Sequence, residues 1–275
     1  HGHTHPPGAT LVFWVLEKLL GDPALMSIAI MLISCSLTMY FVYRLIATEF
    51  KDETARYMSF LVLLLPVVQI YYLASLDALI TALLTGIIYL FAFGKGYRSA
   101  VGAALMLAFS FLLTFVNLFI LPVIVGYDLL VNKSLKRSAI VLGGVAAFHL
   151  VLYLAFGYNA YQSFRTASLY ENPHGFMGFV DPVNYGFTRL EDIAELLFFL
   201  GPFLLVLLFR GLKKIEFKPL NVLIGLAVLT LLAMFVTGAW RTGETARACA
   251  FIYPYLLFPV ARYLENSEAG MPERG

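Results

Sequence analysis

Apolar residues along this chain form long runs that are separated by short polar connections. Each run has roughly 16 to 20 residues, close to what a helix rising about 1.5 Å per residue needs to cross ~30 Å of hydrocarbon. The pattern predicts an all-α fold, a polytopic transmembrane helical bundle with about nine spans. The predicted spans are residues 24–43, 57–74, 77–94, 99–114, 117–131, 138–157, 193–210, 219–238 and 246–262.

The segment 99–131 is long for one helix and short for two. Basic residues flank both of its ends, and two ends on the same side of a membrane require two crossings. We expect the polar residues Thr114 and Asn117 to form the tight outer turn between the two crossings.

A shorter apolar segment, residues 9–20, precedes the first span. It carries Glu17 and Lys18 and ends at the turn sequence Gly-Asp-Pro. Because about 12 residues are too few to cross a bilayer, we expect an interfacial helix on the outer surface, with Trp14 at headgroup depth. The double proline before it sets the angle at which the helix begins, since proline is preorganised for a first helical turn.

The composition agrees with a membrane protein, because 60% of the residues are hydrophobic and only 13% are charged. A soluble protein of this length carries more polar surface. The net charge of +2 is too small to indicate a nucleic-acid partner. Cys35 and Cys249 both fall inside apolar runs, which favours buried free thiols over a disulfide or a metal site.

The basic residues are distributed unevenly between the two sides of the predicted spans. One side holds fourteen Lys and Arg residues, and the other holds five, at positions 18, 165, 189, 241 and 247. The positive-inside rule makes the first side cytoplasmic. We therefore expect a multi-pass cell-membrane protein with its functional face outside the cytoplasm. The predicted parts are an outer stretch with the interfacial helix (1–23), a transmembrane module (24–262) with an outer loop at 158–192, and a cytoplasmic tail (263–275).

The outer loop 158–192 is the one long polar connection in this topology. It is rich in aromatic residues, Gly, Pro and Asn, and its capping-box pattern Thr188-x-x-Glu191 predicts the start of the next helix. Aromatic faces and polar edges suit pyranose rings. The loop therefore offers candidate sugar-binding residues, namely Tyr170, His174, Asp181 and Tyr185, although an ordinary lid with Gly and Pro turns explains them equally well.

Two outer positions carry charges that topology does not explain. Asp77 heads a predicted span, where it either caps the helix after Ser75 or faces a substrate. The sequence WRTGETAR holds Arg241, Glu244 and Arg247 in a turn between two apolar spans. Glu244 stands within one helical turn of Arg247, so it can orient the guanidinium to bind a lipid phosphate. Helix capping and snorkelling to headgroups are the alternatives for this turn.

Four motifs follow one another along the chain: THPPGATLVFWVLEKLLGDPALMSIAIML, LLPVVQIYYLASLDALITALLTGIIYLF, FSFLLTFVNLFILPVIV and RTGETARACAFIYPYLLFPVARYL. In this order they resemble parts of the GT-C superfamily of integral membrane glycosyltransferases, which includes protein O-mannosyltransferases and lipid A aminoarabinose transferases. The corresponding parts are the H/K-P-P end of the first outer loop, a Pro-led span with an Asp-headed span, paired short helices and a GE-x-x-R turn. The resemblance covers nearly the whole chain.

The resemblance implies an inverting transferase that moves a sugar from a polyprenyl-phosphate donor to a lipid, protein or glycan acceptor. It places His5 at the rim of the substrate cavity. It also implies a catalytic base in a first outer loop, upstream of His1, so we expect this fragment to lack the base and to have no transferase activity by itself. Asp77 is the fallback base.

Other functions are open on the sequence alone. His1, His3 and His5 alternate at a spacing that can hold a divalent metal, but a solvated chain end explains them too. The cofactor is otherwise unknown. A transporter or lipid flippase needs internal repeats or ionisable residues near the bilayer midplane; we find no repeat, and His149 comes nearest to such a residue. A non-catalytic membrane subunit is the third alternative.

Overall fold

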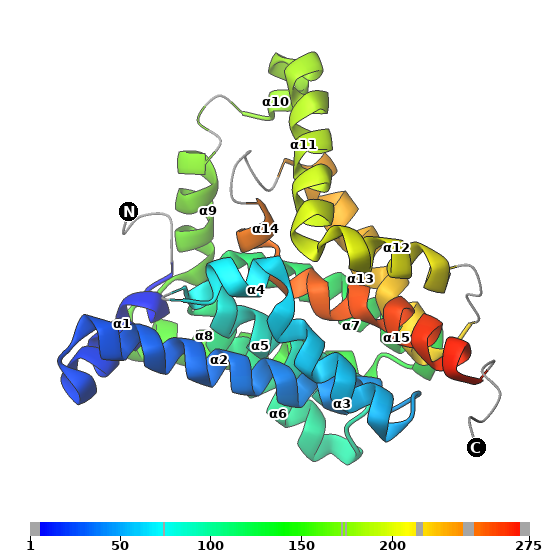
Figure 1. The fold of residues 1–275 in the computed structure, drawn as a ribbon. Helices are drawn as coiled ribbons and strands as arrows, with labels where there is room; N and C mark the ends of the chain where they lie inside the picture. The colour runs from blue at the N-terminus through cyan, green and yellow to red at the C-terminus, as the bar shows by residue number, and fades with distance from the viewer. Residues whose placement is uncertain are drawn as a thin grey trace.

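The structure, a computed structural model, describes residues 6–73, 75–171, 173, 175–212, 217–238 and 245–269. Every regular element in these ranges is helical (Figure 1), so the predicted all-α fold is confirmed there. The elements are α1 (Gly8–Leu20), α2 (Pro23–Ile46), α3 (Asp52–Leu61), η1 (Val62–Leu64), α4 (Pro66–Tyr71), α5 (Leu76–Ala92), α6 (Gly96–Phe111), η2 (Phe115–Phe119), α7 (Ile120–Tyr127), η3 (Asp128–Asn132), α8 (Lys136–Phe156), α9 (Ala160–Glu171), α10 (Met177–Val180), α11 (Pro182–Leu200), α12 (Pro202–Gly211), α13 (Pro219–Val236), α14 (Thr245–Ala248), η5 (Ala250–Ile252) and α15 (Tyr253–Ala269).

Four helical segments of the described ranges are long and apolar enough to cross a membrane. They are α2, the continuous run from η2 through α7 to η3, α8 and α13. The pair α11 and α12 passes the same test when it is taken together, although it bends by 98° at its break. The described part of the chain therefore has four membrane-capable helices, or five if the bent pair counts as one span.

Three predicted spans are divided into shorter helices, so the predicted number of nine spans is not confirmed. The span 57–74 is divided into α3, η1 and α4, because Leu65 is extended before Pro66, which lacks an N–H and disfavours a helical residue in front of it. The span 246–262 is divided into α14, η5 and α15. The span 193–210 bends at Gly201, whose φ is +93°.

The division of the segment 99–131 is confirmed. Helix α6 ends at Phe111, and η2 begins at Phe115 with Thr114 as its N-cap. Asn117 is buried, and its Nδ2 donates to the carbonyl oxygens of Ser110 and Thr114. The two polar residues therefore close the turn by satisfying backbone groups that the helix end leaves open.

Helix α5 lies at the centre of the buried core, and its buried residues lie on all of its sides. It packs against α2, α6, α7 and η5. A helix that is apolar all round belongs inside a protein or a bundle of spans. Its position brings the N-terminus of α5, with Asp77, close to the segment α14–η5.

The connections between helices contact one another in two groups. In the first group, the N–H of Lys51 donates to Glu265, the N–H of Leu220 donates to Glu49, and Arg137 donates to carbonyl oxygens at the end of α5. These residues all belong to connections or helix ends that the charge distribution assigns to the cytoplasm. In the second group, the start of α1 contacts the end of α6, and the start of α5 contacts α14.

The predicted helix at 9–20 is confirmed as α1. Pro7 precedes its first residue, and Gly21, with a φ of +67°, ends it. The carboxylate of Asp22 then accepts from the N–H groups of Ala24 and Leu25 and caps α2. Trp14 is 54% exposed, as a residue at headgroup depth needs to be.

Gly8 fixes α1 to the bundle. Its N–H donates to the carbonyl oxygen of Leu112 over 2.7 Å, and a Cβ added at Gly8 would lie 2.4 Å from that oxygen. We expect Gly8→Ala to displace the start of α1 and to lower the free energy of unfolding by about 1–3 kcal/mol, the usual range for overpacking. Thermal unfolding in detergent measures this loss.

A matched variant separates the contact from the loss of glycine itself. Gly225 lies within α13, and a Cβ added there meets no atom within 4 Å. Gly225→Ala should leave the stability unchanged or raise it by about 0.5–1 kcal/mol, because alanine favours a helix. Equal midpoints for both variants would show that α1 is not held at Gly8.

The predicted outer loop 158–192 is largely helical and contains α9, α10 and most of α11. In Figure 1, α9 and α11 rise separately above the long helix α2, with α10 beside the upper end of α11. The predicted start of a helix at Thr188-x-x-Glu191 is wrong, since α11 begins at Pro182 and the Thr188 hydroxyl donates to the Tyr185 carbonyl inside it. The carboxylate of Asp181 accepts from the N–H of Asn184 instead. An Asp N-cap followed by proline at the first helical position is the stronger signal. The predicted tail 263–275 is also helical as far as Ala269.

Candidate functional site

Two of the candidate residues, Asp77 and Arg247, form an ion pair. The Nε of Arg247 lies 3.2 Å from the Oδ2 of Asp77, although the two residues are 170 positions apart in the sequence. Asp77 stands in the first turn of α5, and Arg247 stands in α14. Their side chains are 33% and 40% exposed, so the pair is reachable from outside the protein.

The surroundings of Asp77 orient its carboxylate. The Ser75 hydroxyl accepts from the N–H of Asp77, which confirms Ser75 as the N-cap of α5. The same hydroxyl donates to the Oδ2 of Asp77 over 2.9 Å. One carboxylate oxygen therefore lies beside both a hydroxyl and a guanidinium, at a helix N-terminus that favours negative charge.

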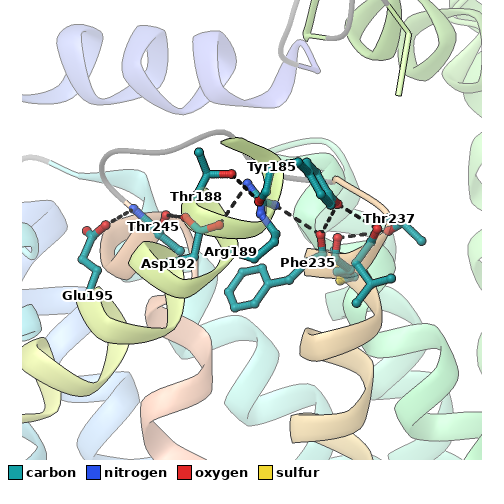
Figure 2. Close-up of polar contacts among 10 residues, drawn as sticks. Tyr185, Thr188, Arg189, Asp192, Glu195, Phe235, Thr237 and Thr245 are labelled. Atoms are coloured by element: carbon teal, nitrogen blue, oxygen red, sulfur yellow. Dashed lines mark hydrogen bonds and ion pairs between the residues drawn. The ribbon is translucent and has the colours of Figure 1, made fainter. Parts of the chain in front are cut away.

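The start of α14 is held by two carboxylates of α11. Glu195 accepts from the N–H groups of Thr245 and Ala246, over 3.2 and 3.0 Å. The Thr245 hydroxyl donates to Asp192, whose side chain is 1% exposed. Figure 2 shows these contacts side by side. Because Thr245 and Ala246 directly precede Arg247, α11 fixes the place from which the arginine extends.

The same face of α11 holds the end of α13. Arg189 pairs with Asp192 at 3.0 Å and donates to the carbonyl oxygen of Phe235 over 3.2 Å. The Tyr185 hydroxyl lies 2.7 Å from the carbonyl oxygens of Phe235 and Val236, and the guanidinium of Arg189 lies over its ring (Figure 2). Tyr185, a candidate for sugar binding, therefore contacts the backbone where α13 ends.

The polar face of α11 thus contacts the residues before and after the connection 239–244, namely the end of α13 and the start of α14. This connection carries Arg241 and Glu244, two further candidates, which lie outside the described residues. The predicted orientation of Arg247 by Glu244 falls there as well. Within the described part of the chain, the carboxylate that pairs with Arg247 is that of Asp77.

The other candidates are distributed differently. His1, His3, His5 and His174 lie outside the described residues. Tyr170 is exposed near the end of α9, and Asp181 caps α11. Where side chains are described, no group of three His, Cys, Asp or Glu residues has the arrangement of a metal site. Cys35 and Cys249 are both free; Cys249 is fully buried, as predicted, whereas Cys35 is only partly buried.

Asp192 and Glu195 were not among the candidates predicted from the sequence. A usable signal was present, because Tyr185, Arg189, Asp192 and Glu195 recur at helical spacing and so share one face of a helix. Treating residues 158–192 as a loop hid this periodicity. It also placed Arg189 in a loop, whereas the residue lies within α11 with a side chain that is only 13% exposed.

Comparisons of the chain with protein-family models, with curated proteins and with solved structures find no match. A half-exposed arginine beside a carboxylate offers a planar cation for a phosphate and an adjacent acceptor for a hydroxyl proton.

Proposed function

We propose that this protein is a multi-pass membrane glycosyltransferase of the GT-C type. It takes a sugar from a polyprenyl-phosphate donor and passes it to a lipid, protein or glycan acceptor on the extracytoplasmic face. The observation that carries the proposal is the Asp77–Arg247 pair. Each residue was selected from the sequence for a separate reason, and the fold brings them together.

The contacts between connections support a topology with nine crossings. If the chain crosses the membrane nine times, successive connections lie on alternate sides, and residues 49–51, 218–220 and 265 fall on the same side. Contacts join them, since Lys51 donates to Glu265 and Leu220 donates to Glu49. It assigns Asp77, Phe235 and Arg247 to the other side, where α11 and the ion pair connect their segments. Shorter helices then complete the crossings that are not single long helices.

Arg247 acts on the donor in this proposal. Its guanidinium holds the phosphate that links the sugar to the lipid, and its charge stabilises that phosphate as it leaves. The acceptor oxygen forms a bond to the anomeric carbon while the bond from that carbon to the phosphate oxygen breaks. The hydroxyl proton passes to a carboxylate, and Asp77 is the candidate among the described residues.

Binding of a polyprenyl phosphate without sugar tests the proposal apart from turnover. Arg247→Ala should weaken binding because it removes the cation. Asp77→Asn should strengthen binding, by up to about fivefold, because it removes a competing anion worth ~1 kcal/mol or less at a partly exposed site. The affinity is measured by titrating the lipid into the protein in detergent micelles.

Glu191→Gln is the matched control, since it removes the same charge from an exposed position of α11. Its affinity should equal that of the unchanged protein. Opposite effects of the Arg247 and Asp77 variants distinguish a phosphate site from a pair that merely holds two helices together. If both variants weakened binding equally, or neither changed it, the proposed donor site would be wrong.

A further inference from the structure

Helix α11 exposes an apolar stripe on one face and turns three charged residues inward on the opposite face, where Leu196 and Leu200 are also buried, while the charged Glu191 is exposed beside the stripe. Val183, Phe187, Leu190 and Phe198 are 63–73% exposed and follow one another at helical spacing along one face. The opposite face carries Arg189, Asp192 and Glu195, whose side chains contact α13 and α14.

Water does not favour this arrangement. An amphipathic helix on a soluble protein turns its apolar stripe to the core and its charges to solvent. A continuous exposed apolar stripe indicates a partner or a membrane. In hydrocarbon the preference is reversed, because charged groups lower their free energy by pairing inside the protein.

The exposed stripe continues beyond α11 at both ends. On α12 it is extended by Phe203, Val206 and Phe209, and on α10 by Phe179 and Val180. Exposed apolar residues on α12 suit a lipid surface for the same reason as those on α11. The stripe on α11 is thus part of a longer exposed apolar surface that includes α10 and α12.

The bend between α11 and α12 sets the orientation of α11. Helix α12 packs closely along α15, where a Cβ added to Gly211 would collide with the backbone of Pro259. Helix α11 stands at 98° to α12 (Figure 1). If α12 follows the direction of the spans, α11 must lie roughly parallel to the membrane plane.

We propose that α11 is embedded in the outer leaflet, parallel to the membrane plane, with its apolar stripe among the acyl chains. The inward face of α11 contacts the end of α13 and the start of α14. The depth of α11 in the bilayer therefore also sets the depth of α14. The consequence for Arg247, that its guanidinium is kept at the level of lipid phosphates, rests on the proposed function. The embedding of α11 does not.

Spin labels on single cysteines test the embedding in liposomes, in a Cys35→Ala, Cys249→Ala background. Labels are placed on the stripe at Phe187 and Leu190, and beside it at the exposed positions Asn184 and Glu191. A label at Leu150, which is exposed on α8, serves as the reference for lipid. The measurement is the collision of each label with oxygen, which concentrates in hydrocarbon, and with a water-soluble nickel chelate.

Labels at Phe187 and Leu190 should resemble the label at Leu150, with frequent oxygen collisions and a loss of nickel collisions relative to Asn184 and Glu191. Nickel collisions as frequent on the stripe as beside it would place α11 in water and overturn the proposal. Protection of the stripe from both reagents would overturn it too, because a second copy or another protein would then cover this face. Neither outcome depends on transferase activity.

Discussion

In the full-length protein, Arg247→Ala is expected to lower kcat/KM for the polyprenyl-phosphate donor by roughly tenfold to a hundredfold. The lost interaction is a charge-assisted hydrogen bond to phosphate, worth ~1.5–3 kcal/mol, and each ~1.4 kcal/mol corresponds to a factor of ten. Arg247→Lys keeps the charge but loses the planar fork, so its loss should be intermediate. Initial rates at varied donor concentration, measured in native membranes, give these values.

Two controls accompany this measurement. Arg165 is an exposed arginine of α9 on the same predicted side, and Arg165→Ala should leave donor kinetics unchanged. The thermal midpoint of each variant must also be compared, since removing Arg247 takes a cation away from Asp77. A folded Arg247→Ala protein with unchanged donor kinetics would show that this arginine is only an anchor at the membrane surface.

Asp192→Ala is expected to cause the largest loss of stability, roughly 3–5 kcal/mol, the range for breaking a buried ion pair from one side. The substitution leaves Arg189 without its buried carboxylate and Thr245 without its acceptor. Asp192→Asn keeps an oxygen for the threonine hydroxyl but loses the charge, so it should fall between Asp192→Ala and the unchanged protein. Thermal unfolding in detergent measures the order of the three midpoints.

The neighbouring residue Glu191 provides the comparison, because it is exposed on the same helix. Glu191→Ala should change the stability by no more than about 0.5 kcal/mol. The double variant Arg189→Met, Asp192→Leu should recover part of the loss, since it removes both charges together. An unchanged midpoint for Asp192→Ala would mean that α11 does not depend on this pair to hold α13 and α14.

The location and the approximate ends of the long apolar helices followed from the sequence, because the signals for them are local. Apolar run length predicted α2, α5, α8 and α13, and the short segment 9–20 predicted α1. At two places where the predicted helix ends were wrong, the sequence carries a local signal stronger than the one used. Pro66 interrupts one span, and Asp181 with Pro182 begins α11 before the expected capping box.

Asp77 and Arg247 were also recognisable from the sequence, as charges at helix ends where topology does not require them. Their contact was not. That Arg247 meets Asp77, 170 residues away, depends on how α14 is placed against α5. The carboxylates of α11 determine that placement, and they come from a third segment of the chain.

The sequence by itself determined that this protein is helical and membrane-like, and which residues begin and end many of its helices. Hydropathy and capping involve residues within a few positions of one another, so they can be evaluated along the chain. The tertiary structure alone decided that Asp77 pairs with Arg247, that Asp192 is buried, and that α11 turns its apolar face outward. Such contacts depend on the rotation and register of packed helices, which distant residues set together.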